Sequence, residues 1–233
     1  MTAPATSSTA QLVLSPSTQT IVAPDAGSLT LTLPRAPAVR TVVDLAVSDR
    51  QAVLVSPFWF DPGQTASTMP VLTFRGSDSV TVMASYGGST ASANLRVLYP
   101  PPVITRVFPP TLTVGVYQPY LQVFDASSPD GPRTIFPASV VRWNGVPLDT
   151  QLVVGDSGLP TFLWARIRPM DVQRPGTATI TVVNPSPGGG TSASLPVEIV
   201  GGAPAPVPTL SPLAAAALVL LLGASGFLGA RRG

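Results

Sequence analysis

Proline and glycine recur so often in this chain that a long helix is not expected before residue 213. The 233 residues include 28 Pro and 20 Gly, and both residue types break helices and mark turns. Between them lie short runs in which apolar and polar residues alternate, such as SLTLTL. Alternation of this kind places the two residue types on opposite faces of a β-strand. Many short strands joined by Pro/Gly turns are typical of sandwiches and barrels, so we expect an all-β protein.

The absence of histidine and cysteine restricts the chemistry further. The sequence contains no His and no Cys, which excludes Ser–His and Cys–His nucleophiles and removes the usual ligands of zinc, copper and haem. No disulfide can form. The hydrophobic fraction of 45% and charged fraction of 10% are those of a folded chain, because disorder requires low hydrophobicity and high net charge. We therefore predict no catalytic residues, no metal site and no cofactor.

The charge distribution argues against a nucleic-acid partner. The net charge is +2, and all 13 basic residues are Arg. They are scattered singly or as loose pairs, without the basic stripe and interleaved aromatics that phosphate binding needs.

The first half of the chain has the pattern of a sandwich. Leu29, Leu31 and Leu33 alternate with polar residues and should share one face of a strand. Gly87 and Gly88 separate two apolar-alternating runs and predict a two-residue hairpin turn. Turn signals recur every 8 to 12 residues, the spacing expected for a β-sandwich.

The second half begins after YPPPV at 99–103, where three consecutive prolines predict an extended spacer. Asn144-Gly145 between SVVRW and VPLDTQLVV predicts a β-hairpin. TFLWARI alternates as a strand, and we expect Trp143 and Trp164 to be core residues.

Three stretches cover nearly all of residues 102–199: PVITRVFPPTLTVG, SVVRWNGVPLDT and GTATITVVNPSPGGGTSASLPVEI. They resemble the IPT/TIG family of immunoglobulin-like domains. FDASSPDGPRTIFPA at 124–138 departs from the family, which more often has a short glycine-rich turn there. In the first half, VDLAVSDRQAVLVSPFWFDPGQTAS and SVTVMASYGGSTASANLRVL resemble a bacterial immunoglobulin-like domain. The resemblances imply two tandem immunoglobulin-like β-sandwiches.

The C-terminal apolar run predicts a single transmembrane helix. Residues 213–230 carry no charge and would span about 27 Å as a helix, close to the hydrocarbon thickness of a membrane. A helix buried in a globular core would show polar residues every three or four positions. Arg231 and Arg232 should remain cytoplasmic, which places residues 1–206 on the outer face. A plain one-pass anchor and a processed sorting signal both fit this layout.

The lead before this run reads Val207-Pro208-Thr209-Leu210-Ser211. It resembles the IPTL-CTERM class of bacterial sorting signals, with Val in place of Ile. Families of this class usually continue with an acidic residue and an aromatic, whereas Pro212 and Leu213 follow here. The resemblance implies recognition by an exosortase-like membrane enzyme and export to the cell envelope or matrix.

The expected division of the chain follows from these features. MTAPATSSTAQ has neither the basic nor the apolar region of an export signal, so we expect a start that lies upstream or an unstructured beginning. The expected segments are an unstructured or truncated N-terminus at 1–10, a bacterial immunoglobulin-like sandwich at 11–99, a proline linker at 100–102, an IPT/TIG sandwich at 103–200, a linker at 201–206 and the sorting signal at 207–233.

Few residues are candidates for a binding role. Alternation in PFWFDPG sends Phe58 and Phe60 to one face and Trp59 to the other. One of these faces should be exposed, and an exposed aromatic can stack on a sugar or anchor a partner. We name Trp59 as the candidate contact for a glycan or partner protein, against core or inter-domain packing. Asp125 and Asp130 lack the ligand spacing of a calcium loop and are interpreted as turn residues.

We expect a non-catalytic structural or adhesive protein of a bacterial cell envelope or matrix. It would face outward, be anchored at least transiently by its C-terminal helix, and contact the membrane, the sorting enzyme and an envelope or matrix polysaccharide or protein. The alternative is a carbohydrate-binding accessory fragment of a larger exported enzyme. An upstream domain with paired carboxylates would favour the alternative.

Overall fold

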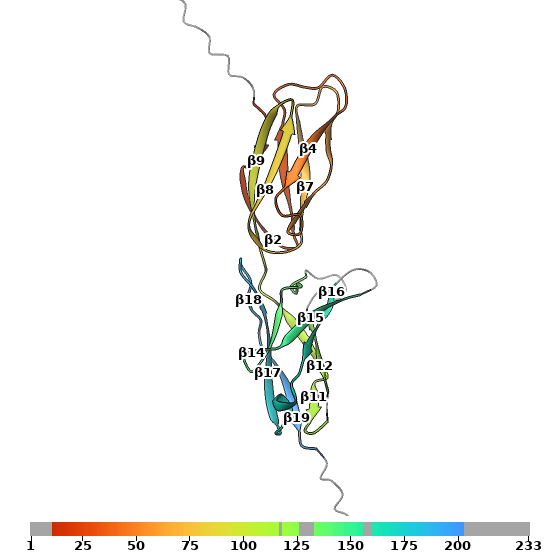
Figure 1. The fold of residues 1–233 in the computed structure, drawn as a ribbon, viewed down its shortest axis with the longest axis vertical. Helices are drawn as coiled ribbons and strands as arrows, with labels where there is room; N and C mark the ends of the chain where they lie inside the picture. Colours follow the sequence, from red (N-terminus) through yellow and green to blue (C-terminus); the bar gives the residue numbers. More distant parts are fainter. Residues whose placement is uncertain (1–10, 117, 126–132, 156–159, 203–233) are drawn as a thin grey trace, which may run out of the picture. The chain divides into compact units, whose positions relative to one another are not determined.

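The computed structural model describes residues 11–116, 118–125, 133–155 and 160–202. Strands dominate these residues, and the only helical segment among them is the short 3-10 turn η1 (Pro169–Val172). Figure 1 shows the strands gathered into two sandwiches, one containing β4, β7, β8 and β9 and the other β12, β15, β16, β17 and β19. The predicted all-β class is confirmed.

The first sandwich is built from two sheets, and its outer strands are short. One sheet has the order β1 (Val13–Ser15), β3 (Ala26–Thr32), β7 (Ala66–Thr73) and β5 (Val53–Val55). The other has the order β2 (Thr18–Val22), β9 (Ser89–Leu98), β8 (Ser77–Tyr86), β4 (Thr41–Val47) and β6 (Phe58–Phe60).

The inward faces of both sheets form one apolar core. Leu29, Leu31 and Leu33 are at most 3% exposed, as their alternation predicts. They belong to the same buried cluster as Val82 and Leu95 from the opposite sheet. Burial of such side chains contributes about 1.5–3 kcal/mol each, the main force holding the two sheets together.

The second sandwich repeats the arrangement. One sheet has the order β10 (Ile104–Phe108), β12 (Tyr120–Asp125), β16 (Pro160–Arg166) and β15 (Asp149–Val154). The other has the order β11 (Thr111–Thr113), β19 (Leu195–Val200), β17 (Gly176–Asn184), β13 (Val140–Trp143) and β14 (Val146–Pro147), with β18 (Gly190–Thr191) also paired to β17.

The second core buries Trp143 but not Trp164. Trp143 is 4% exposed and packs within the buried cluster, as expected. Trp164 is 37% exposed and lies on the outer face of its sheet, so the prediction that it is a core residue is wrong. Its neighbours Leu163 and Ala165 are fully buried, and strict alternation then turns Trp164 away from the core.

Both sandwiches have an immunoglobulin-like strand order. The orders β1-β3-β7-β5 and β10-β12-β16-β15 correspond to strands A, B, E and D, and β9-β8-β4 and β19-β17-β13 correspond to G, F and C. Short strands β2 and β11 pair in parallel with β9 and β19. In each case a proline, Pro16 or Pro109, lies where the chain leaves the first sheet for the second. Proline suits this position because it has no N–H to donate to the sheet it leaves.

Two tight turns match the sequence prediction, but the strand after the second turn does not. Gly87 and Gly88 connect β8 to β9, and Asn144 and Gly145 connect β13 to β14, all four with positive φ. The hairpin expected to continue through 146–154 ends after β14, and β15 instead pairs with β16 in the opposite sheet. Leu148, between β14 and β15, is buried in the core, which fixes the crossing point.

A buried polar network surrounds Asn184 at the end of β17. Asn184 is 2% exposed; its Nδ2 donates to the carbonyl oxygens of Pro100 (2.9 Å) and Thr134 (2.8 Å). Its Oδ1 accepts a hydrogen bond from Ser139 Oγ (2.5 Å). Since buried polar groups are costly unless paired, this side chain holds three separate segments in one arrangement.

Tyr99, directly after β9, lies against the loop that follows β17. Its N–H donates to the Pro187 carbonyl (2.9 Å), and its own carbonyl accepts from the Gly189 N–H (2.7 Å). Its ring meets Phe136 edge-on, with centroids 5.0 Å apart. The proline-rich segment is therefore hydrogen-bonded where it begins.

Within the described residues, no helix is long and apolar enough to cross a membrane. The predicted transmembrane helix at 213–230 lies outside those residues.

Candidate functional site

Trp59 lies on β6, an edge strand of the first sandwich. Phe58 and Phe60 point inward, at 7% and 0% exposed, and their rings meet edge-on with centroids 5.4 Å apart. Trp59 points outward and is 44% exposed, directly opposite Val42 on β4, which is 67% exposed. The predicted alternation of the three aromatics is confirmed, and Trp59 is the member that faces outward.

Arg40 covers part of the Trp59 ring. Its Cζ lies 4.5 Å from the ring centroid, and its Nε lies 3.7 Å from Asp61 Oδ1. Both charged side chains are more than 60% exposed, so the ion pair itself contributes little. The Trp59 cluster, comprising Arg40, Val42, Trp59 and Asp61, is small, and one ring face is partly occupied by the guanidinium.

A larger group of exposed aromatics lies on the outer face of the second sandwich, on the sheet β10-β12-β16-β15. The Tyr120 and Trp164 rings are stacked with centroids 5.3 Å apart, and the ring centroids of Trp164 and Phe162 lie 6.0 Å apart. The ring centroids of Phe162 and Phe124 lie 5.3 Å apart, and Arg106 Cζ lies 4.1 Å from the Phe124 ring centroid. We call this surface the aromatic face; its rings are Phe108, Tyr120, Phe124, Phe162 and Trp164.

Polar side chains alternate with these rings across the sheet. Trp164 is paired with Gln122 on β12 and with Gln151 on β15, so an amide lies on each side of the indole. One row further along, Arg166 is paired with both Tyr120 and Asp149. The face therefore combines aromatic surface with amide, guanidinium and carboxylate groups.

A recess of about 450 Å³ adjoins this face beside Arg166. One wall carries Arg168, whose Nε and Nη2 donate to the two oxygens of Asp171 at 3.0 and 2.9 Å. The Arg168 guanidinium is thus already occupied. The recess is lined by Pro147, Leu148, Asp149, Arg166, Ile167, Arg168 and Pro169.

The aromatic face is not among the features predicted from the sequence, from which Trp164 is expected to be a core residue. A usable signal was present, because YLQVFD and TFLWARI each carry their aromatics on one alternation phase and their aliphatic residues on the other. Whichever phase forms the core, the other phase must be exposed when only one face of the sheet is covered.

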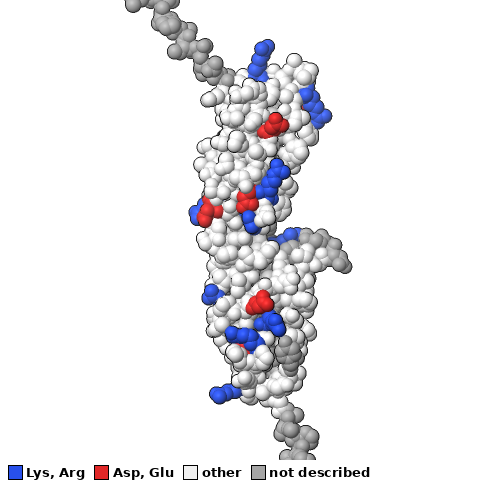
Figure 2. Space-filling model, in the orientation of Figure 1, with Lys and Arg blue, Asp and Glu red and all other residues white. Residues whose placement is uncertain are grey.

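Of the two acidic residues considered as metal ligands, the structure describes Asp125. Asp125 is buried at 5% exposed and accepts from the Thr134 N–H at 3.0 Å. No group of three or more His, Cys, Asp or Glu side chains that could hold a metal occurs in the part of the chain that the structure describes. Asp130 lies outside it. On the face seen in Figure 2, charges of both signs are scattered over an otherwise uncharged surface.

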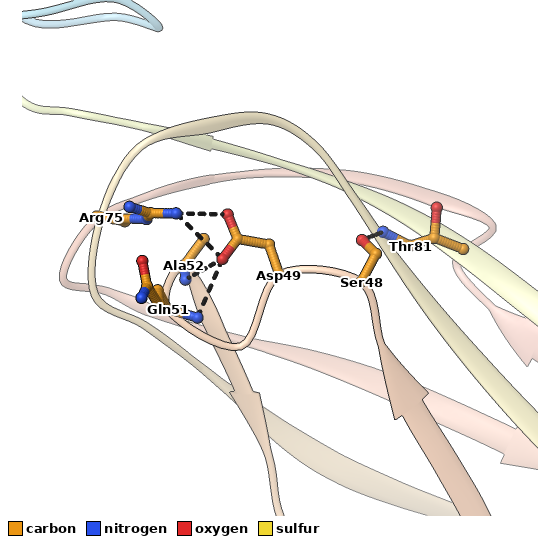
Figure 3. Close-up of polar contacts among 6 residues, drawn as sticks. All are labelled: Ser48, Asp49, Gln51, Ala52, Arg75 and Thr81. Atoms are coloured by element: carbon orange, nitrogen blue, oxygen red, sulfur yellow. Dashed lines mark hydrogen bonds and ion pairs between the residues drawn. The ribbon is translucent and has the colours of Figure 1, made fainter.

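Asp49 forms the tightest surface ion pair of the first sandwich, at the loop between β4 and β5 (Figure 3). Arg75 Nη2 donates to Asp49 Oδ2 at 3.0 Å, and the N–H groups of Gln51 and Ala52 donate to Oδ1 at 3.0 and 3.2 Å. Burial alone would raise the pKa of the Asp49 carboxyl. The hydrogen bonds from Arg75, Ala52 and Gln51 outweigh burial and hold the pKa below its ordinary value. The pair joins two loops, and it is a structural contact.

The residues predicted for sorting and topology lie outside the described residues. They are Val207, Pro208, Thr209, Leu210, Ser211, Arg231 and Arg232.

The strand order and the two separate cores define the described chain as a tandem of immunoglobulin-like β-sandwiches. No family model and no curated protein matches the sequence. The assignment therefore rests on the topology.

Solved structures that resemble the chain include fragments of the surface layer protein SbsC and of titin. Domains 4-9 of the surface layer protein SbsC match at 15% identity and a TM-score of 0.33 over 82% of this chain, which spans 31% of that fragment. Domains 5-6 of SbsC match at 14% and 0.32, covering 83% of this chain and 98% of that one. The titin tandem A164-A165 matches at 14% identity and a TM-score of 0.31, covering 82% of this chain and 95% of the titin fragment.

Proposed function

We propose that this protein is a non-catalytic structural or adhesive module of a bacterial cell envelope or extracellular matrix. The observation that carries the proposal is the combination of two tandem immunoglobulin-like sandwiches with a charge-free apolar run at 213–230 that ends in two arginines. A helix of that length suits a membrane, and the arginines would keep their end cytoplasmic. The sandwiches would then stand on the outer side.

In this proposal the C-terminal segment is a sorting signal of the IPTL-CTERM type, and the second sandwich is of the IPT/TIG type. Val207-Pro208-Thr209-Leu210-Ser211 is the recognised lead, and an exosortase-like membrane enzyme cleaves near it. The adhesive role is supported by the exposed aromatics of the second sandwich, since large exposed apolar patches on a folded domain mark interaction surfaces. The absence of His and Cys removes the commonest nucleophile systems.

Two measurements test the proposal. Protease treatment of intact cells that express the full reading frame should degrade the sandwiches, whereas protection until lysis would contradict outward display. The intact mass of the protein from the envelope fraction should correspond to a chain that ends before Leu213. A mass that corresponds to the chain up to Gly233 contradicts processing, and the C-terminal segment would then be a plain membrane anchor. Replacement of Pro208 and Thr209 by alanine should restore the full-length mass if cleavage depends on the lead.

A further inference from the structure

We infer that the aromatic face of the second sandwich binds an acidic polysaccharide, one whose sugar rings carry carboxylates. The face spans four strands, about 14 Å at the usual strand spacing. The inference names the partner class of the adhesive role proposed above, and it rests on that role.

The rings supply the apolar part of the site. Tyr120, Trp164 and Phe108 are 43%, 37% and 53% exposed, although aromatics of this size dominate core energetics elsewhere. The negatively charged face of an aromatic ring attracts the C–H groups of a pyranose, which carry partial positive charge. Stacked Tyr120 and Trp164 form a ridge whose outer ring face and edges remain accessible to such a ligand.

The amides supply the hydrogen bonds that hydroxyl groups require. Gln122 and Gln151 lie on either side of Trp164, and neither side chain makes a hydrogen bond within the described residues. Each amide offers two donors and one acceptor. A hydrocarbon partner would leave these groups buried and unpaired, at a cost of about 1–3 kcal/mol each. A sugar satisfies them, because every hydroxyl both donates and accepts.

The charges favour an anionic sugar over a neutral one. Arg106 and Arg166 carry two positive charges on the face, against one negative charge on Asp149, which gives a net charge of +1. Arg106 stacks on Phe124, an arrangement that leaves its in-plane N–H donors directed away from the ring. Neither guanidinium has a carboxylate within ion-pair distance among the described residues, whereas Arg168 does. A guanidinium binds a carboxylate in bidentate fashion.

Other occupants fit less well. Residues 1–10 and 203–233 of this chain contain no Asp or Glu, so they offer nothing to the two arginines. A second copy packed face to face about a two-fold axis would bring arginines toward arginines. An acidic peptide that added to the sheet would pair with a strand edge through its backbone, and the aromatic face is the flat side of the sheet.

The test uses the full chain in mild detergent and measures its binding to immobilised polygalacturonate. We expect binding that weakens as salt is added, since salt screens exposed charges. Trp164→Ala, Arg166→Gln and Gln151→Ala should each weaken it, the first two by about tenfold or more. Gln151 is exposed on an edge strand, so its truncation leaves the fold intact. Phe74→Ala and Arg50→Gln, at exposed positions of the first sandwich, are the controls and should bind as the parent does.

Three outcomes would overturn the inference. One is the absence of binding to polygalacturonate, and another is a loss of binding caused by the first-sandwich variants alone. The third is equal binding of poly-L-glutamate, which would show a site for any polyanion. Polygalacturonate with its carboxylates reduced should bind at least tenfold more weakly. None of these results bears on outward display or tail cleavage, so failure of the inference is separable from failure of the proposed function.

Discussion

The side chain of Asn184 should contribute more to the free energy of unfolding than a single amide group usually does. Its side chain makes three hydrogen bonds, to Pro100, Thr134 and Ser139, at a position 2% exposed to solvent. Each contributes about 0.5–1.5 kcal/mol net, and groups left unpaired in the interior add to the loss. Asn184→Ala should therefore lower the free energy of unfolding of the second sandwich by about 2–4 kcal/mol.

Asn184→Asp is the sharper variant because it keeps the shape and exchanges the NH₂ donor for an oxygen. That oxygen would face the carbonyls of Pro100 and Thr134 at the donor's present distances of 2.9 and 2.8 Å. Because two carbonyl acceptors would then face a buried carboxylate, Asn184→Asp should lower the free energy of unfolding by about 3–5 kcal/mol at neutral pH. Protonation restores a donor, so part of this loss should disappear in acid.

The assay is urea unfolding, with hydrogen exchange read by mass spectrometry to assign each transition to its sandwich. Asn94→Ala is the matched control, because Asn94 is exposed and makes one side-chain hydrogen bond, with Ser79 at 2.9 Å. This substitution should change the free energy of unfolding of the first sandwich by less than about 0.5 kcal/mol. If Asn184→Ala were equally mild, the network would not be holding the three segments, and the reasoning would fail.

Three further predictions concern the first sandwich and the loop between β17 and β18 of the second sandwich. The Asp49 pKa is lowered on folding, so its contribution to stability is complete above the unfolded value of about 3.9 and is lost as pH falls through the lower folded value. Acid titration of unfolding should show this loss, Asp49→Asn should flatten it, and an unchanged profile would refute the assignment. Gly188→Ala should destabilise by about 2 kcal/mol or more, because φ is +72° and a Cβ would lie 2.6 Å from the Tyr99 carbonyl oxygen. Gly63→Ala, with φ +83° and open space around it, should lower the free energy of unfolding by only about 1 kcal/mol, and thermal melts of the two variants and the parent compare them. Phe60 is 0% exposed, so Phe60→Ala should lower the free energy of unfolding by about 3–5 kcal/mol, whereas Trp59→Ala should lower it by less than about 1 kcal/mol. Similar losses for the two variants would contradict the inward and outward alternation of side chains on β6.

Local chemistry in the sequence was sufficient to predict the strands and the tight turns. Gly87-Gly88 and Asn144-Gly145 form turns because glycine and asparagine tolerate positive φ, a property of those residues wherever they occur. Leu29 and Leu31 are buried because period-2 alternation gives a strand one apolar face. The lack of His and Cys limited the available chemistry without any knowledge of the fold.

Strand partners and the buried phase of each strand depended on the tertiary structure. In TFLWARI both phases carry large apolar residues, so alternation alone does not say whether Trp164 or Leu163 faces the core; packing against the second sheet buries Leu163. β14 and β15 are separated by one residue in the sequence, yet they belong to different sheets. The aromatic face brings together Arg106, Tyr120, Gln151 and Trp164, which are far apart in the chain. Periodicity describes one strand at a time, whereas a surface of this kind exists only once four strands lie side by side.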